Sequence, residues 1–272
     1  MSQTMRLVHE PTGERMIPES ADLFTFWEHV YRYAFACSFV KGKRVLDIAC
    51  GEGYGTAALQ NAGAASVVGV DVSEDVCFHA RSKYGIDARQ GSAENLPLGD
   101  ASIDMVVSFE TIEHVPQPQR FLDECVRVLT PGGMLIISTP NKSVYGQDVP
   151  NPHHCSEMTE EEFTSAMRSQ FHDCHFYTQR PSSNAWWSIR TMASETSPWI
   201  RVRGFYRLRR AMQKIFVPEA INPPTMEQRE SVLELIVAIG KSPWRLFNPF
   251  VLRPQQNGNR EKPRYFVATA IR

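Results

Sequence analysis

The chain has 272 residues and a formal net charge of −1, with 42% hydrophobic and 22% charged residues. This is ordinary globular composition, and the near-zero charge excludes a global attraction to nucleic acid or membranes. Six cysteines without a C-x-x-C pair favour reduced thiols over a disulfide framework. The first twenty residues lack the apolar core of a signal peptide, and no apolar run has the length of a membrane span. We therefore expect a cytoplasmic protein.

Strand-like apolar runs alternate with helical patterns between residues 23 and 140. The first element is an aromatic-rich helix over 23–40, which Gly42 closes. Predicted strands follow at 45–48, 67–72, 87–90, 103–109 and 134–138, with predicted helices at 56–60, 73–84 and 119–129 and a tight turn at 130–133. This alternation predicts right-handed βαβ crossovers and a doubly wound α/β sheet.

The pattern changes after Pro140. A polar loop over 141–158 precedes a helix over 160–169, and a sixth strand is predicted over 171–179. The last run, 264–271, is strongly strand-like and is predicted to close the sheet. The proline-interrupted residues 182–262 are predicted to form a mostly helical insertion that shapes an acceptor site. The catalytic domain would then comprise residues 1–181, completed by 263–272.

In doubly wound sheets the ligand lies beyond the carboxyl ends of the strands. Four of these ends carry glycine-rich or polar sequence, at 51–55, 71, 91–95 and 109–114. A dinucleotide fingerprint, G-x-G-x-x-G, would need a glycine where the chain has Thr56. Asp47, inside the preceding strand, would repel a pyrophosphate but suits the ammonium of an amino-acid-bearing nucleoside. These residues turn the prediction away from a dinucleotide.

Five segments carry a family resemblance: VLDIACGEGYG, VVGVDVS, GSAENLPLGDASIDMVVS, FETIEHV and RVLTPGGMLIISTPN. In these segments, within about residues 40–140, the chain resembles the class I S-adenosylmethionine (SAM)-dependent methyltransferases, in particular the group containing sugar and small-molecule methyltransferases. The resemblance implies a Rossmann-like, seven-stranded sheet whose last strand is antiparallel. It also implies SAM as the cofactor, lying across the strand ends.

The resemblance further implies a set of cofactor-binding residues. Asp47, Gly51 and Gly53 would serve the methionine portion of SAM, Asp71 the ribose hydroxyls, and residues 92–94 the adenine. Serine stands at 92 where similar sequences often have aspartate, and the segments 13–19 and 28–36 resemble segments that cover SAM. The full predicted set is Arg15, Met16, Tyr33, Asp47, Gly51, Gly53, Asp71, Val72, Ser92, Ala93, Glu94 and Phe109.

A hydroxyl acceptor needs a base, because its proton must leave as the new C–O bond forms. His114 lies just past the fourth strand, where the family places acceptor-facing residues, and His154 lies in the loop 151–157. An imidazole with its usual pKa of about 6.5 accepts a proton near neutrality. We predict both histidines as catalytic; a surface or capping role is the competing interpretation for each.

Several residues of types that bind metal ions lie close together in the sequence and suggest a metal site. His153, His154, Cys155 and Glu157 are close in sequence, and an H-x-x-H pattern spans 172–175. Adjacent histidines in an extended loop point apart, and an H-x-x-H pattern on a strand divides its rings between the two faces. We therefore expect no bound metal.

Two features of the insertion bear on the acceptor. Residues 199–216 form a basic amphipathic helical pattern that could contact an anionic membrane or a lipid-linked substrate, although a helix packed on the domain is the competing interpretation. Trp186 and Trp187 could stack on a sugar ring, and a place in the hydrophobic core is the competing interpretation. The predicted function is O-methylation of a sugar or glycan-linked hydroxyl by SAM, with a histidine base. Alternatives are a small aromatic, isoprenoid or amino acceptor, and a non-catalytic nucleotide-binding or NAD-dependent protein.

Overall fold

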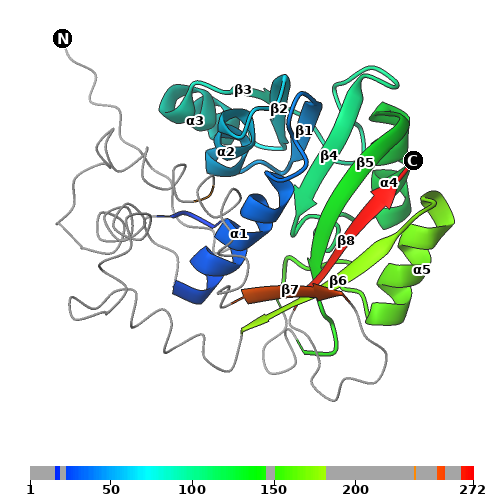
Figure 1. Ribbon diagram of the computed structural model, residues 1–272. Helices are drawn as coiled ribbons and strands as arrows, with labels where there is room; N and C mark the ends of the chain where they lie inside the picture. The colour runs from blue at the N-terminus through cyan, green and yellow to red at the C-terminus, as the bar shows by residue number, and fades with distance from the viewer. Residues whose placement is uncertain (1–15, 19–22, 145–150, 182–235, 237–249, 255–264) are drawn as a thin grey trace, which may run out of the picture.

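The computed structural model describes residues 16–18, 23–144, 151–181, 236, 250–254 and 265–272 (Figure 1). Its sheet has eight strands in the order β3-β2-β1-β4-β5-β8-β6-β7. The strands are β1 Arg44–Ile48, β2 Ser66–Asp71, β3 Asp87–Gln90, β4 Ile103–Phe109, β5 Leu129–Pro140, β6 His175–Pro181, β7 Phe250–Pro254 and β8 Tyr265–Ile271. The helices are α1 Leu23–Ala36, α2 Tyr54–Asn61, α3 Glu74–Tyr84, α4 Pro118–Val128 and α5 Glu160–Gln170.

The sheet has the predicted direction of its strands. Strands β1 to β5 pair in parallel, and β8 runs antiparallel between β5 and β6, with Ile137 of β5 opposite Ala268 of β8. Without β7 the sheet has seven strands, of which the last, β8, is antiparallel to its neighbours. This arrangement confirms the predicted fold class. The carboxyl ends of β1, β2, β3 and β4 consequently lie along one edge of the sheet, where the ligand was expected.

The eighth strand, β7, was not predicted. It pairs antiparallel with β6 at the edge of the sheet, with Arg253 opposite Thr178. The prolines at 249 and 254 appeared in the sequence as breaks between helices, but an edge strand accommodates proline at its end because no further strand needs its N–H. The predicted insertion therefore contributes at least one strand among its described residues.

The two largest hydrophobic clusters lie on opposite faces of the sheet, because side chains along each buried strand alternate between the faces. Met105 and Val107 of β4 belong to the core beneath α1 and α2, and Val106 belongs to the core beneath α4 and α5. Figure 1 shows this layering, with α1, α2 and α3 on one side of the sheet and α4 and α5 on the other. The continuous apolar runs of the sequence are explained by burial on both faces.

Helix-capping residues in the sequence mark the first residues of α3 and α5. Thr159 begins α5 with a complete capping box, in which its side chain accepts from the Glu162 N–H and the Glu162 carboxylate accepts from the Thr159 N–H. Ser73 caps α3. The predicted turn at 130–133 was wrong as a boundary, because β5 already starts at Leu129. Ile103 pairs with Leu129 and Met105 with Met134, so the turn residues form an irregularity inside the strand.

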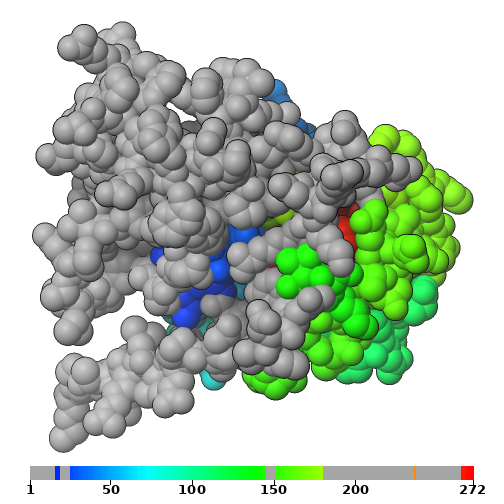
Figure 2. Space-filling view, turned by 90° about the horizontal axis from the view of Figure 1, so that it is seen from below, coloured from blue at the N-terminus to red at the C-terminus, as the bar shows by residue number. Residues whose placement is uncertain are grey.

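Most of the insertion, including the basic segment 199–216, Trp186 and Trp187, lies outside the described residues, as does Arg15. Among the helices that are described, none combines the length and apolarity needed to cross a bilayer. Helix α5 and the adjoining β6 residues form an exposed surface at one side of the molecule, coloured yellow-green in Figure 2.

Candidate functional site at the carboxyl ends of the strands

The Asp71 carboxylate organises the glycine-rich loop. Its Oδ2 accepts a hydrogen bond from the Gly51 N–H (3.0 Å), and its Oδ1 accepts one from the Ser73 N–H (3.0 Å). These bonds tie the loop after β1 to the end of β2. Each carboxylate oxygen retains a second lone pair, so the arrangement is compatible with the predicted bond to a ribose diol. That role for Asp71 remains a prediction.

Asp47 is a fully buried acid at the same edge of the sheet. Its carboxylate accepts from Thr56 Oγ1 (2.6 Å) and from the Tyr33 hydroxyl (3.2 and 3.3 Å). Burial raises the pKa of Asp47 to about 7, although these hydrogen bonds act in the opposite direction. Among the described residues the carboxylate has no ion pair. A buried carboxylate in this state favours a cationic ligand.

The third glycine of the motif, Gly55, has a structural explanation. A Cβ at Gly55 would lie 2.0 Å from Cζ of Tyr33, so the residue must lack a side chain to admit the tyrosine ring. The ring also makes edge contacts with Phe109 (centroids 5.1 Å apart) and Tyr54 (5.4 Å). Met16 is buried in the same hydrophobic cluster. Tyr33 thus contacts two other predicted cofactor residues, Asp47 and Phe109, and shares a hydrophobic cluster with a third, Met16.

Val72, predicted to bind the cofactor, and residues 92–94, predicted for the adenine, lie just beyond the ends of β2 and β3. Val72 follows Asp71 and is 74% exposed, which is unusual for an aliphatic side chain on this domain. Ser92 Oγ accepts from the Glu94 N–H (3.1 Å). The Glu94 carboxylate accepts from the Gln117 N–H (2.7 Å), so it caps the start of α4. Glu94 therefore has a structural task beside its predicted cofactor role, which is untested.

The two predicted catalytic histidines are neighbours. The rings of His114 and His154 pack edge to face, with centroids 4.7 Å apart. His114 Nδ1 donates to the backbone carbonyl of His153 (3.2 Å), because a carbonyl oxygen can only accept. His154 Nδ1 is 2.7 Å from Oε1 of Glu157. In this tautomer the basic nitrogen of His114 is Nε2.

Glu113 is a site residue that the sequence analysis did not single out. Its side chain is fully buried, and its Oε2 accepts from Thr139 Oγ1 (3.0 Å). Burial raises the pKa of Glu113 to about 8, with a further contribution from the neighbouring charge of Glu110. Its backbone carbonyl accepts from the N–H groups of Cys155 and Ser156. The available signal was its position directly before a predicted base.

A second unpredicted network links the end of β4 to α1. Glu110 adopts a positive φ of 52° and forms an ion pair with the buried guanidinium of Arg32. His29 Nε2 lies 3.5 Å from the same carboxylate, and His29 Nδ1 lies 3.2 Å from the Tyr54 hydroxyl. Burial lowers the pKa of His29, which favours its neutral form. The network holds α1 against the strand end that carries His114.

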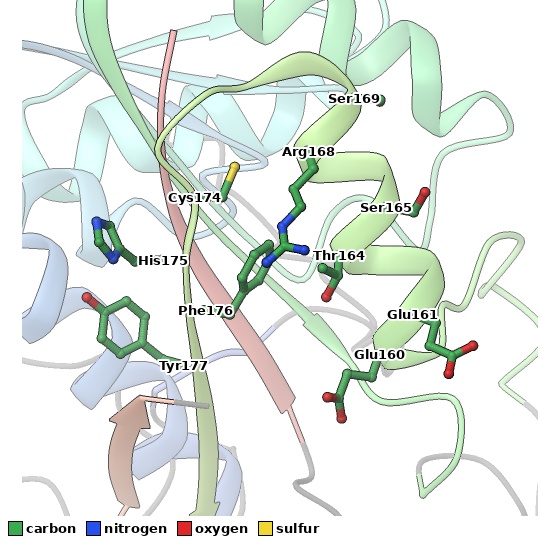
Figure 3. A pocket seen from close by; sticks show the side chains of 10 residues that line it. All are labelled: Glu160, Glu161, Thr164, Ser165, Arg168, Ser169, Cys174, His175, Phe176 and Tyr177. Atoms are coloured by element: carbon green, nitrogen blue, oxygen red, sulfur yellow. The ribbon is translucent and has the colours of Figure 1, made fainter. Parts of the chain in front are cut away.

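A separate groove of about 1090 Å³ lies between α5 and β6 (Figure 3). Its described lining residues are Glu160, Glu161, Thr164, Ser165, Arg168, Ser169, Cys174, His175, Phe176 and Tyr177. Arg168 lies over the Phe176 ring, 5.4 Å from its centroid. None of the predicted site residues lines this groove. The candidate site therefore lies at the strand ends and is separate from this groove.

Comparison with known proteins finds similarity to methyltransferases. Residues 46–137 match the family model described as "Methyltransferase domain". A Mycolicibacterium smegmatis protein named as a probable S-adenosylmethionine-dependent methyltransferase is 41% identical over 167 residues, which cover 58% of this chain and 63% of that protein. A Coxiella burnetii ubiquinone biosynthesis O-methyltransferase is 37% identical over 109 residues, or 38% of this chain and 46% of that protein.

Solved structures agree at the level of the fold. A SAM-dependent methyltransferase from Archaeoglobus fulgidus superposes with a TM-score of 0.56 at 16% identity, covering 96% of this chain and 97% of that chain. The chain therefore has the fold of the class I SAM-dependent methyltransferases, and its residues 46–137 match the methyltransferase domain. The matched segment spans less than two thirds of the length of the curated relatives.

The residues present fit SAM. The buried Asp47 carboxylate lacks an ion pair among the described residues and can receive the ammonium group of the ligand. The Gly51 N–H is bonded to Asp71 at the same edge of the sheet. The remaining lone pairs of the Asp71 carboxylate can accept hydrogen bonds from the ribose diol. The exposed Val72, which follows Asp71, offers an apolar surface beside the predicted ribose position. The family therefore implies SAM as the cofactor of this domain.

Proposed function

We propose that the chain methylates a hydroxyl group of a sugar or a glycan-linked acceptor, with SAM as the methyl donor. Bound SAM supplies an electrophilic methyl group on a sulfonium. Much of the rate of such a transfer comes from alignment of donor and acceptor, which the residues at the ends of β1, β2 and β4 would provide. Asp47 and Asp71 would fix the donor on one side of this edge.

The observation that carries an oxygen acceptor is the geometry of His114. Its Nδ1–H is held by the carbonyl of His153, which leaves Nε2 as the nitrogen that can accept a proton. The ring lies against His154, whose own Nδ1 is held by Glu157. We assign His114 as the base that takes the hydroxyl proton, and His154 as the group that borders the acceptor.

A methyl-transfer assay with labelled SAM and a panel of sugars and glycans tests the proposal. His114→Ala should lower kcat about 10²-fold while the affinity for SAM, measured by calorimetry, stays nearly unchanged. His172→Ala is the matched control, because His172 is an exposed histidine outside the candidate site. Unchanged turnover in His114→Ala would remove the base assignment. Binding of NAD without binding of SAM would reject the function altogether.

The second candidate is a small aromatic or isoprenoid acceptor. It is favoured by the Coxiella burnetii relative, whose name places it in ubiquinone biosynthesis as an O-methyltransferase. Both candidates share an oxygen acceptor and the same donor site. Including phenolic and isoprenoid hydroxyl compounds in the assay panel separates them, because the favoured class should show the higher kcat/KM.

For the insertion, we propose that residues 182–262 form part of the acceptor pocket and that the basic segment 199–216 contacts a membrane or a lipid-linked substrate. The support is its sequence alone, with six basic residues among apolar residues at helical spacing. Sedimentation of the full chain with anionic and with neutral liposomes tests this contact. Equal recovery with both kinds of liposome would favour a helix packed on the domain.

A further inference from the structure

Three side chains of metal-ligand type converge beside the end of β4. Glu113, His114 and His154 each offer one ligand atom, and these atoms lie within 4.8 Å of one another. Two come from the segment after β4, and the third comes from the loop before α5. The sequence analysis expected no metal, since it considered His153 and His154 as neighbours that point apart. The fold instead pairs His154 with His114, which is forty residues away.

Backbone hydrogen bonds hold the two segments together. The N–H groups of Cys155 and Ser156 both donate to the carbonyl of Glu113 (2.8 and 2.9 Å). Ser156 Oγ donates to the carbonyl of Val115 (2.9 Å). These contacts flank the cluster on either side. The loop pairing therefore holds the backbones of the three residues close to one another.

Glu113 supplies an independent indication of a ligand. Its side chain has no exposed surface, and only its Oε2 has a hydrogen-bond donor, Thr139 Oγ1. Among the described residues, Oε1 has no hydrogen-bond partner. An unsatisfied buried carboxylate oxygen is costly, because it has lost its bonds to water and gained no partner in their place. A cation at the cluster would remove this cost.

The outer contacts of both imidazoles are those that metal-bound histidines make. Ligand histidines donate their second N–H to a carbonyl or a carboxylate, which fixes the tautomer and the ring orientation. His114 Nδ1 has the His153 carbonyl as its acceptor, and His154 Nδ1 has the Glu157 carboxylate. Each ring consequently has Nε2 as its basic nitrogen. The same contacts make Glu157 an outer partner of the cluster.

We propose that Glu113, His114 and His154 bind one divalent transition-metal ion such as Zn²⁺, Fe²⁺ or Mn²⁺. Two imidazoles and one carboxylate suit these ions better than Mg²⁺ or Ca²⁺, which prefer oxygen ligands alone. With ligand distances of about 2.1 Å, a tetrahedral ion needs its ligand atoms about 3.4 Å apart. The ligand atoms of the cluster, within 4.8 Å of one another, would have to move closer together when the ion binds.

Resting on the proposed function, the ion would receive the acceptor hydroxyl in its open coordination position. Coordination lowers the pKa of a bound hydroxyl, so its proton can leave to water near neutral pH. In the metal-bound protein His114 Nε2 would be a ligand and could not accept a proton, so the ion would take over the activation of the acceptor that the metal-free assignment gives to His114. The loss of activity in His114→Ala is common to both roles, so metal binding has to be measured directly.

The test uses the full chain, stripped with a chelator and titrated with Zn²⁺ by calorimetry and with Co²⁺ by visible absorption. We expect one ion per chain and a Co²⁺ spectrum that indicates nitrogen ligands. Glu113→Gln and His154→Ala should weaken Zn²⁺ binding at least tenfold, and Glu157→Gln about 10- to 100-fold. The control His172→Ala should bind Zn²⁺ as the wild type does.

Absence of stoichiometric Zn²⁺ and Co²⁺ binding overturns the proposal, as does binding that Glu113→Gln and His154→Ala leave unchanged. If Glu113→Gln does not fold, His154→Ala and Glu157→Gln decide the matter, because both residues lie in the loop before α5 and neither is fully buried. Methyl transfer at full rate in excess chelator overturns the metal's role and leaves the proposed function standing. Zn²⁺ binding in a chain that does not bind SAM supports the site and rejects that function.

Discussion

Replacing Asp47 with asparagine should stabilise the ligand-free protein and weaken its hold on SAM. The carboxylate is fully buried, and its pKa lies at about 7 instead of its ordinary value of 3.8. The folded state therefore keeps a proton that the unfolded chain has lost between these pH values. Stability consequently falls as the pH rises from 3.8 to 7, and the loss is complete above the folded-state pKa.

The magnitude follows from the two pKa values. A pKa difference of about 3, at about 1.4 kcal/mol per pKa unit, makes the ionised Asp47 cost about 4 kcal/mol of unfolding free energy at pH 8. Asparagine has nearly the same shape and no charge, and its oxygen can still accept from Thr56 Oγ1. We expect the stability advantage of Asp47→Asn to grow by about 3 kcal/mol between pH 5 and pH 8.

Two measurements check this reasoning. Urea denaturation of both proteins at several pH values gives the difference in unfolding free energy. Calorimetry should show that Asp47→Asn weakens SAM binding about 10- to 100-fold, the value of a charge-assisted hydrogen bond. Asp104→Asn is the control of opposite sign, because Arg44 lowers the pKa of Asp104 to about 2. A stability difference that does not vary with pH, or unchanged SAM affinity, would refute the argument.

Three further predictions concern Asp71, Gly55 of the glycine-rich motif, and Thr159 at the start of α5. Asp71→Asn should weaken SAM binding about tenfold in calorimetry, since it removes a charged acceptor at the ribose position. Gly55→Ala should destabilise the fold by about 1–3 kcal/mol or more through overlap with the Tyr33 ring, whereas Gly99→Ala, with open space around it, should be nearly neutral. Thr159→Ala should cost about 1 kcal/mol in urea denaturation by removing the cap of α5.

The fold was largely predictable from the sequence because its signals are local. A strand buried on both faces is mostly apolar along its length, as β4 is. A capping box in the sequence predicts the first residue of a helix, as it does for α5. The edge strand β7 gave no such signal. It pairs with β6, more than sixty residues earlier, and partner strands at that separation leave no pattern in either segment.

The site was predictable in part, and the reasons differ from residue to residue. The three alternate glycines suggested a ligand, yet Gly55 is explained by the ring of Tyr33. The SAM-binding residues could be predicted because, in a doubly wound sheet, the ligand lies beyond the carboxyl ends of the strands. The meeting of Glu113 with His154 could not, because it depends on backbone bonds from Cys155 and Ser156 that no sequence pattern encodes.

Backbone strain marks where donor and acceptor should meet. Among the described residues, three non-glycine residues have positive φ, and two of them, Ala49 and Glu110, directly follow β1 and β4. Left-handed backbone at such residues costs free energy and persists only where the surroundings enforce it. At Glu110 the enforcement is visible, because its N–H donates to the Ser138 carbonyl and its carboxylate pairs with Arg32. This conformation turns the chain directly after β4, three residues before Glu113 and four before His114. The backbone strain therefore lies next to the residues that we assign to the acceptor.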